Sequence, residues 1–337
     1  MKAYRLNAPG TARAWEPITL PDPTPGRGEV LVGVRATSLN YREIMLAKGT
    51  YPIPPKQDCI PVGDGAGEVL AVGEGVSTFK VGDRVAAGLF QSWTKGQFRA
   101  ADYGNSLGAS LDGMLAEKVV LSASGLVAVP PHLSYEEAAT LPCAALTAWH
   151  ALMESGAQLR PGSVVLTLGT GGVSLFAIQL ARAAGYQVIA TSSSDAKLGA
   201  LGAMGATHGI NYRTTPAWSD EVMRLTGGAG ADLIVEVAGS TLNRSLDAVA
   251  FGGTVSVIGS VGGSTAEPFN ARSLYARCAR MYGVAVGSIE MFERMNRAIA
   301  AHRIRPVIDS VHEFDRANEA LARLEGGAHF GKVVIRV

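Results

Sequence analysis

The stretch VVLTLGTGGVSLFAIQLARAAG, residues 164–185, decides the fold class of this chain. A short, largely apolar run typical of a buried strand leads into Gly169, Gly171 and Gly172, and an amphipathic helical pattern follows. Glycine allows a tight turn and the close approach of a pyrophosphate, while the helix start offers free N–H groups and a positive dipole end. We predict that this turn binds a dinucleotide through the three glycines and Val173. A ligand-free connection is the alternative, but it does not need three glycines within four residues.

This turn lies in a regular alternation of strand and helix patterns. The strands are largely apolar on both faces, as a parallel sheet covered on both sides requires. We therefore predict a doubly wound α/β domain of the Rossmann type over residues 130–287. Its expected strands are 163–168, 187–191, 232–237 and 253–258, and its expected helices are 173–184, 195–204 and 241–249.

The remaining residues indicate a second domain with a different pattern of secondary structure. Short strand patterns between glycine and proline residues fill the first third of the chain, as in EVLVGVRATSL (29–39), and predict an irregular β-barrel. Helical patterns after the α/β domain lead into a last strand, GKVVIRV (331–337). The substrate domain is expected to combine residues 1–129 with 288–337.

Composition argues against several kinds of partner. Thirty Lys and Arg residues against 29 Asp and Glu give a formal net charge of +1, which favours neither nucleic acid nor an anionic membrane. No apolar stretch approaches the roughly 20 residues needed to span a bilayer. The three cysteines, Cys59, Cys143 and Cys278, form no C-x-x-C pair. We expect a soluble protein of the reducing cytoplasm that acts on a small-molecule substrate.

The stretch VIATSSSDAK (188–197) bears on the type of dinucleotide. An acid at the end of the second strand binds the ribose diol of NAD and would repel a 2′-phosphate, but Ser192 stands there. Lys197 follows in the next helix and Tyr212 follows the third strand, and hydroxyls with a cation suit a phosphomonoester. The alternative is a serine that only starts a helix and a solvated surface lysine. Together the residues favour NADP(H).

Six motifs, in order along almost the whole chain, resemble the medium-chain dehydrogenase/reductase superfamily. The resemblance implies an oxidoreductase with a GroES-like irregular β-barrel substrate domain and a Rossmann domain. The motifs are GEVLVGVRATSLN (28–40), PVGDGAGEVLAVGEGVSTFKVGDRV (61–85), DGMLAEKVVL (112–121), AATLPCAALTAWHAL (138–152), GTGGVSLFAIQLAR (169–182) and HFGKVVI (329–335).

The positions that hold catalytic zinc in alcohol dehydrogenases of this superfamily are altered here. The resemblance matches Asn40 to a cysteine ligand, Asp64 to a histidine ligand and Cys143 to a third ligand. Zinc prefers thiolate and imidazole, and none of the six histidines falls at a matching position. The four-cysteine structural lobe of those enzymes is also missing. We predict no catalytic metal, and we expect Cys143 to be a small core residue.

Without zinc, the chain looks most like the quinone-oxidoreductase and enoyl-reductase branch. Members of that branch carry an asparagine at the place of Asn40, and a lysine and a tyrosine that hold the NADP phosphate at the places of Lys197 and Tyr212. The resemblance implies that Asn40 could donate an N–H to a substrate carbonyl. It also implies that Tyr51 could orient the substrate or give it a proton, although a tyrosine can line a pocket merely for packing.

Further cofactor contacts follow from the resemblance and from the sheet edge. Thr147 matches a residue close to the nicotinamide, and a helix-interior threonine bonded to its own backbone is the alternative. Gly239, Gly259 and Ser260 follow later strands on the edge along which a dinucleotide extends, and simple turn chemistry is the alternative there.

Two segments depart from the branch. Tyr41, Arg42 and Glu43 replace the small residues and aspartate common after the asparagine, so the pocket floor is altered, and Arg42 with Glu43 could be only an internal ion pair. Residues 89–113 carry several aromatic side chains, and they could form a wall over the substrate or cover the barrel.

We therefore expect an NADPH-dependent, zinc-independent oxidoreductase that transfers a hydride to a quinone, an enone or a similar activated acceptor, since conjugation carries the arriving charge without a metal. The alternatives are an alcohol dehydrogenase or carbonyl reductase of the same superfamily, and a catalytically idle NADPH-binding protein. In relatives the last sheet strand, here MYGVAVG (281–287), pairs with its twofold mate, so a homodimer is expected.

Overall fold

A computed structural model describes residues 1–9, 11, 13–259 and 268–337, which form two compact units. The first unit combines Met1–Leu146 with Val286–Val337, and the second is Thr147–Ala285. Residues 130–146, which the sequence assigns to the nucleotide domain, lie in the first unit because helix α2 (Tyr135–Ala139) contacts its strands β3 (Glu29–Ser38) and β4 (Asp64–Val72). Within the described ranges, no helix is long and apolar enough to cross a membrane.

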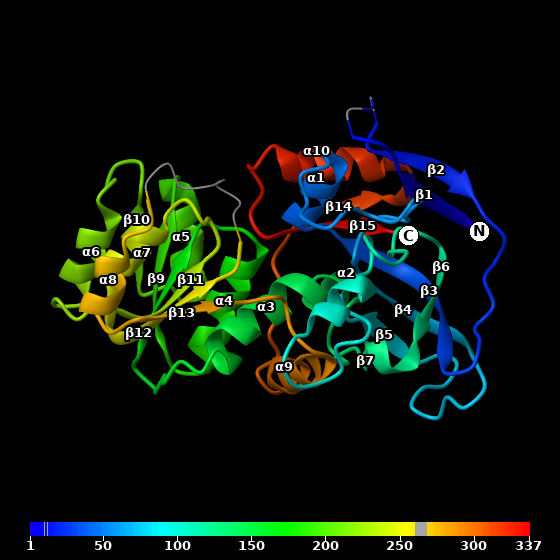
Figure 1. The fold of residues 1–337 in the computed structure, drawn as a ribbon, viewed down its shortest axis with the longest axis horizontal. Coiled ribbons are helices and arrows are strands. Elements are labelled where there is room, and N and C mark those ends of the chain that lie inside the picture. Colours follow the sequence, from blue (N-terminus) through cyan, green and yellow to red (C-terminus); the bar gives the residue numbers. More distant parts are fainter. Residues whose placement is uncertain (10, 12, 260–267) are drawn as a thin grey trace. The chain divides into compact units, whose positions relative to one another are not determined.

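The second unit is built on a parallel sheet of six strands in the order β10-β9-β8-β11-β12-β13 (Figure 1). From the central strand β8 the chain moves outward to β10, and it then continues from β11 to the other edge. The order therefore reverses between β8 and β11, which confirms the predicted doubly wound Rossmann fold. The strands are β8 (Val164–Leu168), β9 (Gln187–Ser192), β10 (His208–Asn211), β11 (Ala231–Glu236), β12 (Val249–Val257) and β13 (Arg280–Gly283).

Helices cover both faces of this sheet. Val165 and Leu166 of β8 point to opposite faces because side chains alternate along a strand, and both are fully buried. Leu166 belongs to a core that includes Trp218 and Leu246, from two of the covering helices. The helices of this unit are α4 (Gly172–Ala183), α5 (Asp195–Met204), α6 (Trp218–Leu225), α7 (Leu242–Ala248) and α8 (Ala271–Ala276).

The last strand of this sheet is shorter than the sequence predicts. It covers Arg280–Gly283 rather than residues 281–287. Val286 has a φ of +51°, a left-handed conformation that an extended strand does not contain. The chain therefore leaves the sheet before the end of the MYGVAVG motif.

The first unit is a mostly antiparallel β structure, in agreement with the predicted barrel-type domain. Its larger sheet has the order β14-β15-β3-β4-β5-β7, β6 also pairs with β3, and β1 pairs with β2. One core, centred on residues such as Trp15, Val32 and Leu115, joins these sheets with α10. Besides α2, β3 and β4, this unit contains β1 (Lys2–Leu6), β2 (Trp15–Thr19), α1 (Tyr41–Ala47), β5 (Arg84–Ala87), β6 (Lys118–Ser122), β7 (Leu126–Ala128), α9 (Ile289–Ala301), β14 (Ile308–Glu313), α10 (Ala317–Glu325) and β15 (Lys332–Arg336).

The helical stretch that begins at Ser134 is segmented rather than continuous. Ser134 accepts a hydrogen bond from the backbone N–H of Glu137, as the capping pattern predicts. After α2 the chain forms a π-helical segment, Leu141–Ala145, then α3 (Leu146–Trp149) and a second π-helical segment, His150–Glu154. Pro142 lacks an N–H, so the regular α-helical pattern cannot pass through it.

The aromatic residues of segment 89–113 divide between the core and the surface. Phe90 and Trp93 are buried in the core of the first unit, so part of the segment covers the barrel. Tyr103 is 44% exposed and borders a pocket, so another part forms a wall. The cover over the barrel is therefore present, and the wall over the substrate stays a prediction.

Candidate functional site

A buried polar cluster in the first unit contains Asn40, one of the two predicted catalytic residues. The amide nitrogen of Asn40 donates to Asp64 Oδ2 at 2.8 Å, and its amide oxygen accepts from Lys332 Nζ at 2.6 Å. Lys332 also donates to the carbonyl oxygen of Leu39 at 2.5 Å, and its Nζ lies 3.8 Å from Asp64 Oδ2. These residues meet because β15, β3 and β4 are neighbours in one sheet.

Burial controls the charges of this cluster. Asp64 and Lys332 are 0% and 3% exposed. Burial raises the pKa of Asp64 to about 7, although Lys332 and the hydrogen bond from Asn40 act in the opposite direction. Burial, reinforced by Asp64, raises the pKa of Cys143 to about 12, so Cys143 is a thiol at neutral pH. Within the described part of the chain, Asp64 Oδ1 has no hydrogen-bond partner.

Arg42 and Glu43 form a buried ion pair beside this cluster. Arg42 Nη1 lies 3.3 Å from Glu43 Oε1, and Glu43 also accepts from the backbone N–H groups of Asn40 at 2.8 Å and Gly63 at 3.3 Å. A Cβ atom at Gly63 would lie 2.4 Å from Arg42 Nη1, so only glycine leaves room for the guanidinium. The guanidinium carbon lies 5.4 Å from the centre of the Tyr51 ring, within cation–π range. The pair therefore links the backbone of Asn40 to Tyr51.

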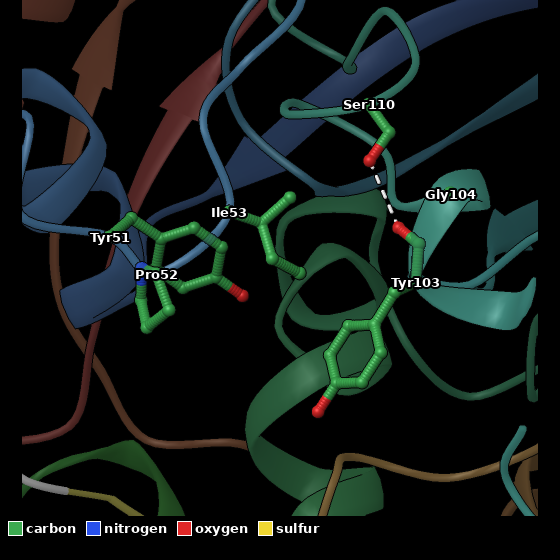
Figure 2. A pocket seen from close by; sticks show the side chains of 6 residues that line it. All are labelled: Tyr51, Pro52, Ile53, Tyr103, Gly104 and Ser110. Carbon is green, nitrogen blue, oxygen red and sulfur yellow. Dashed lines mark hydrogen bonds between the residues drawn. The ribbon is translucent and has the colours of Figure 1, made fainter. Parts of the chain in front are cut away.

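Tyr51 also lines a pocket of about 380 Å³ in the same unit (Figure 2). Figure 2 shows Ile53 between the rings of Tyr51 and Tyr103. The carbonyl oxygen of Tyr103 accepts a hydrogen bond from Ser110 at 2.9 Å, and Phe98 meets the Tyr103 ring edge-on with the ring centres 4.7 Å apart. The pocket therefore presents aromatic and aliphatic surface. Its lining residues are Tyr51, Pro52, Ile53, Tyr103, Gly104 and Ser110.

The predicted dinucleotide turn lies between β8 and α4. Gly169 has a φ of +76°, which favours glycine, and its N–H bonds to the Thr191 carbonyl at 3.0 Å. Gly171 precedes the first residue of α4, Gly172, and has an ordinary φ of −77°. A Cβ at Gly171 would meet no atom within 4 Å, so the packing of the chain itself does not require glycine there. Open space at a helix N-terminus is suited to a phosphate group.

Two residues of the α4 first turn complete this local structure. Val173 lies in that turn and is half-buried. Ser174, which stands at the last glycine position of the G-x-G-x-x-G pattern, donates its hydroxyl to the carbonyl oxygen of Leu168 at 2.6 Å. The hydroxyl therefore ties the helix start to the preceding strand.

The residues predicted to select NADP(H) lie at the ends of β9 and β10. Ser192 is 2% exposed, and its hydroxyl accepts from the Ser194 N–H at 3.3 Å. Ser194, not Ser192, caps α5 by accepting from the Lys197 N–H at 3.4 Å. Tyr212 is 41% exposed, and its N–H bonds to the Ser192 carbonyl at 3.0 Å. Pairing of β9 with β10 thus brings Ser192 and Tyr212 to one edge of the sheet, and Lys197 lies in the first turn of α5, which follows β9 in the chain.

A buried carboxylate organises the loop that follows β11. Glu236 is 0% exposed, and its Oε1 accepts from the N–H groups of Ala238 at 2.9 Å and Gly239 at 3.0 Å. It also accepts from the hydroxyls of Thr241 at 2.9 Å and Ser245 at 2.5 Å. The predicted cofactor residue Gly239 is therefore held in place by Glu236.

The other predicted cofactor residues occupy separate places in the second unit. Thr147 is buried in α3, and Gly259 follows β12 in a half-buried position. Ser260 lies outside the described residues.

Sequence reasoning missed Lys332 and Glu236. Each is a charged residue next to a run of apolar residues in a predicted strand, VVI in GKVVIRV and LIV in DLIVEV. Charged groups are rarely buried unless they are paired, so a charge in such a strand is the signal that could have found them.

The chain matches known families over most of its length. The family model described as "Alcohol dehydrogenase GroES-like domain" matches residues 26–131, and that described as "Zinc-binding dehydrogenase" matches residues 172–301. A zinc-type alcohol dehydrogenase-like protein of Schizosaccharomyces pombe is 44% identical over 316 residues, 92% of this chain and 91% of that protein. An alcohol dehydrogenase of Geobacillus stearothermophilus is 32% identical, with 92% of each chain covered.

Solved structures show the same likeness in three dimensions. An NAD-dependent alcohol dehydrogenase has a TM-score of 0.89 and 35% identity, with 100% of both chains covered. A cobalt- and zinc-bound thermostable alcohol dehydrogenase of Pyrobaculum aerophilum has a TM-score of 0.86 and 27% identity, with 100% of this chain and 99% of that chain covered. This chain therefore belongs to the medium-chain dehydrogenase/reductase superfamily, as an oxidoreductase of the alcohol-dehydrogenase type whose family uses a nicotinamide cofactor.

Proposed function

We propose that this protein is an NADPH-dependent, zinc-independent oxidoreductase that transfers a hydride to a quinone, an enone or a similar activated acceptor. The observation that carries the proposal is the Asn40 amide, held between Lys332 and Asp64 at the place that the family resemblance matches to a zinc ligand. A neutral N–H donor can stabilise moderate charge on an acceptor oxygen, which is what a conjugated acceptor needs.

The donor set at this place does not fit zinc. Asn40 turns its N–H toward Asp64 and its oxygen toward an ammonium group, so neither atom is left for a metal. Lys332 Nζ, 3.8 Å from Asp64 Oδ2, would repel a divalent cation, and the Cys143 thiol would first have to lose its proton. Among the described residues, no group of three or more His, Cys, Asp or Glu side chains could hold a metal ion.

The pocket beside Tyr51 suits a flat, conjugated acceptor. When bound, reduced nicotinamide supplies a hydride, and the protein must orient the acceptor and provide a proton. The rings of Tyr51 and Tyr103 and the side chain of Ile53 offer surface against which a planar molecule can stack. We assign proton donation to the Tyr51 hydroxyl and stabilisation of an acceptor oxygen to Asn40.

The proposed NADPH site is the edge of the parallel sheet in the second unit. The pyrophosphate is assigned to the turn Gly169–Val173, and the 2′-phosphate to Ser192, Lys197 and Tyr212. Gly239 and Gly259 are assigned to later parts of the dinucleotide. The role of Thr147 near the nicotinamide stays a prediction from the family resemblance, and that of Ser260 stays a prediction from its place on the sheet edge.

We further propose that the nucleotide domain is residues 130–287, that the substrate domain combines 1–129 with 288–337, and that the protein is a homodimer. Support for the dimer comes from β13, which ends the sheet order and presents the half-exposed side chain of Met281. An unpaired strand edge of this kind favours pairing with a second copy. Sedimentation equilibrium should give a mass about twice the 35.0 kDa of one chain.

A panel of cofactors and acceptors tests the proposal. NADPH and NADH are each combined with 1,4-benzoquinone, a 2-enone, an enoyl thioester and an aldehyde, and alcohol oxidation is measured with both oxidised cofactors. Faster turnover of the quinone or enone with NADPH supports the proposal. Preferred oxidation of a simple alcohol with NAD would contradict the proposal and would indicate an alcohol dehydrogenase, the activity in the names of several relatives. Tight NADPH binding without turnover on any acceptor would indicate a binding protein.

A further inference from the structure

We propose that Lys332 is a positioning residue for the reaction, because its ammonium group fixes the Asn40 amide in one orientation and strengthens the N–H that Asn40 offers to the acceptor. This inference rests on the proposed role of Asn40. It adds a residue from β15, at the far end of the sequence, to a site that the motifs place near residue 40.

Charge determines which way the Asn40 amide faces. An ammonium group only donates, so the Asn40 atom 2.6 Å from Lys332 Nζ is the amide oxygen. The Asn40 atom on the other side, 2.8 Å from Asp64 Oδ2, is then the amide nitrogen, which donates to Asp64. A flipped amide would place its N–H groups against the donor groups of Lys332. Lys332 and Asp64 therefore hold the amide in one orientation.

The orientation leaves one N–H of Asn40 for another molecule. Within the described part of the chain, the Asn40 nitrogen makes one side-chain hydrogen bond, to Asp64. The amide is planar, so this bond also fixes the direction of the second hydrogen. Asn40 is half-buried, whereas Asp64 and Lys332 are buried, so Asn40 is the member of the trio that a small molecule can reach.

Lys332 also changes how well that N–H donates. A charge-assisted hydrogen bond to the amide oxygen draws electron density away from the amide nitrogen, and hydrogen bonds in such a chain strengthen one another at low dielectric. Lys332 touches neither acceptor nor cofactor in this scheme, and it acts only through Asn40.

Because Lys332 is buried, the alternative is that it serves only to stabilise the fold. Loss of hydration is costly for a lysine that is 3% exposed, even though Leu39, Asn40 and Asp64 supply partners. A methionine could fill the same space without a charge. If Lys332 serves only the fold, its replacement should change stability and leave the turnover of folded enzyme unchanged.

A double-mutant cycle separates the two roles, with NADPH and 1,4-benzoquinone as the probes. Lys332→Met should lower kcat about 10- to 100-fold and leave the KM for NADPH within about twofold, and Lys332→Arg should recover part of the loss. In an Asn40→Ala background, Lys332→Met should cost no more than about a further twofold, because the group it acts through is gone. An equal loss of kcat in both backgrounds overturns the inference.

A second variant distinguishes a loss of activity caused by unfolding from one caused by the missing ammonium group. Lys332→Met alone leaves the buried Asp64 without its cation, so it is compared with Lys332→Met/Asp64→Asn, in which both charges are removed. Urea unfolding measures the stability of each variant. Asp64→Asn alone is the reference, because Asp64 also contacts the Asn40 amide. A stable double variant with a lower kcat than Asp64→Asn supports the inference, and a stable double variant with the kcat of Asp64→Asn overturns it.

Nuclear magnetic resonance distinguishes failure of this inference from failure of the proposed function. If the wild-type protein reduces no acceptor, the proposed function fails, but the side-chain amide of Asn40 can still be observed and assigned by its loss in Asn40→Ala. We expect both amide proton shifts of Asn40 to differ from those of a solvent-exposed asparagine in the wild-type protein and in Lys332→Arg, and to move toward the exposed values in Lys332→Met. Unchanged shifts in Lys332→Met would show that Lys332 does not orient the amide.

Discussion

The guanidinium of Arg42 lies 5.4 Å from the centre of the Tyr51 ring and is bound at the same time to the buried carboxylate of Glu43. A fixed cation therefore lies over the Tyr51 ring, and the same residue lines the pocket. Glu43 also accepts a hydrogen bond from the backbone N–H of Asn40. The Arg42–Glu43 ion pair therefore contacts both predicted catalytic residues, Tyr51 and Asn40. Changes at Tyr51 and Asn40 can be interpreted separately only with stability measured alongside activity.

Replacing Tyr51 with Phe tests proton donation. The ring keeps its cation–π contact with Arg42 but loses the hydroxyl that interacts with this buried guanidinium, so the free energy of unfolding should fall by about 1 to 3 kcal/mol. Without the hydroxyl, kcat for an enone should fall about 100-fold, because general acid catalysis typically supplies that much. Tyr103→Phe is the matched control, since it removes a hydroxyl from the same pocket. Equal, small losses in both variants would assign Tyr51 to packing.

Asp64 should make the stability of the first unit depend on pH. Burial raises its folded pKa to about 7 from the ordinary value of 3.8, so the folded state holds a proton that the unfolded state has lost between these values. The free energy of unfolding should therefore fall as pH rises from about 4 to about 7, with a limiting slope of about 1.4 kcal/mol per pH unit. Asp64→Asn should flatten this dependence in urea unfolding.

Asp309 is a control of opposite sign for that experiment. Although burial opposes it, hydrogen bonds from Arg323 and from the Phe330 N–H lower the pKa of Asp309. Its contribution to stability should be present above the unfolded pKa and should be lost as pH falls through the lower folded value. If Asp309→Asn and Asp64→Asn changed the pH profile in the same direction, the charge assignment at Asp64 would be wrong.

Lys197→Ala tests recognition of the 2′-phosphate. Loss of a charge-assisted hydrogen bond should raise the dissociation constant for NADPH about 10- to 100-fold and leave that for NADH unchanged. Isothermal titration measures both constants. Arg272→Ala, which removes an exposed cation from α8 in the same unit, is the control for long-range charge. A parallel loss of NADH affinity would place Lys197 outside the phosphate site.

Glu236→Ala should destabilise the loop after β11. The substitution leaves two backbone N–H groups and two hydroxyls without their acceptor, which predicts a loss of about 3 to 5 kcal/mol. Glu236→Gln, which keeps one carbonyl oxygen, should cost less. Hydrogen exchange at the Gly239 N–H reports the loop directly, and unchanged protection in Glu236→Ala would contradict this role.

Removal of metal ions should leave activity unchanged. The lysine and amide at the place of the zinc ligands predict the same kcat before and after prolonged dialysis against a chelator, with zinc well below one atom per chain by elemental analysis. Loss of activity on chelation, restored by added zinc, would contradict the proposed chemistry.

The sequence by itself determined the Rossmann unit. The glycine turn at 169–172, the helix that starts at Gly172 and the helix at 195–204 all depend on short-range turn, capping and periodicity signals, and the structure contains them at or within a residue or two of the predicted positions. The capping-box spacing of Ser134 and Glu137 likewise indicates a helix start, which the structure contains, and Pro142 lies in the π-helical segment that follows.

Only the tertiary structure decided what surrounds the candidate catalytic residues. Lys332 and Asn40 are separated by 292 positions, and they meet because β15 pairs with β3. No local pattern encodes that contact, since strand pairing across such a separation depends on the packing of the whole unit. For the same reason no sequence signal showed that Asp64 would be buried beside an ammonium group, although the family resemblance matches both Asn40 and Asp64 to zinc-ligand positions.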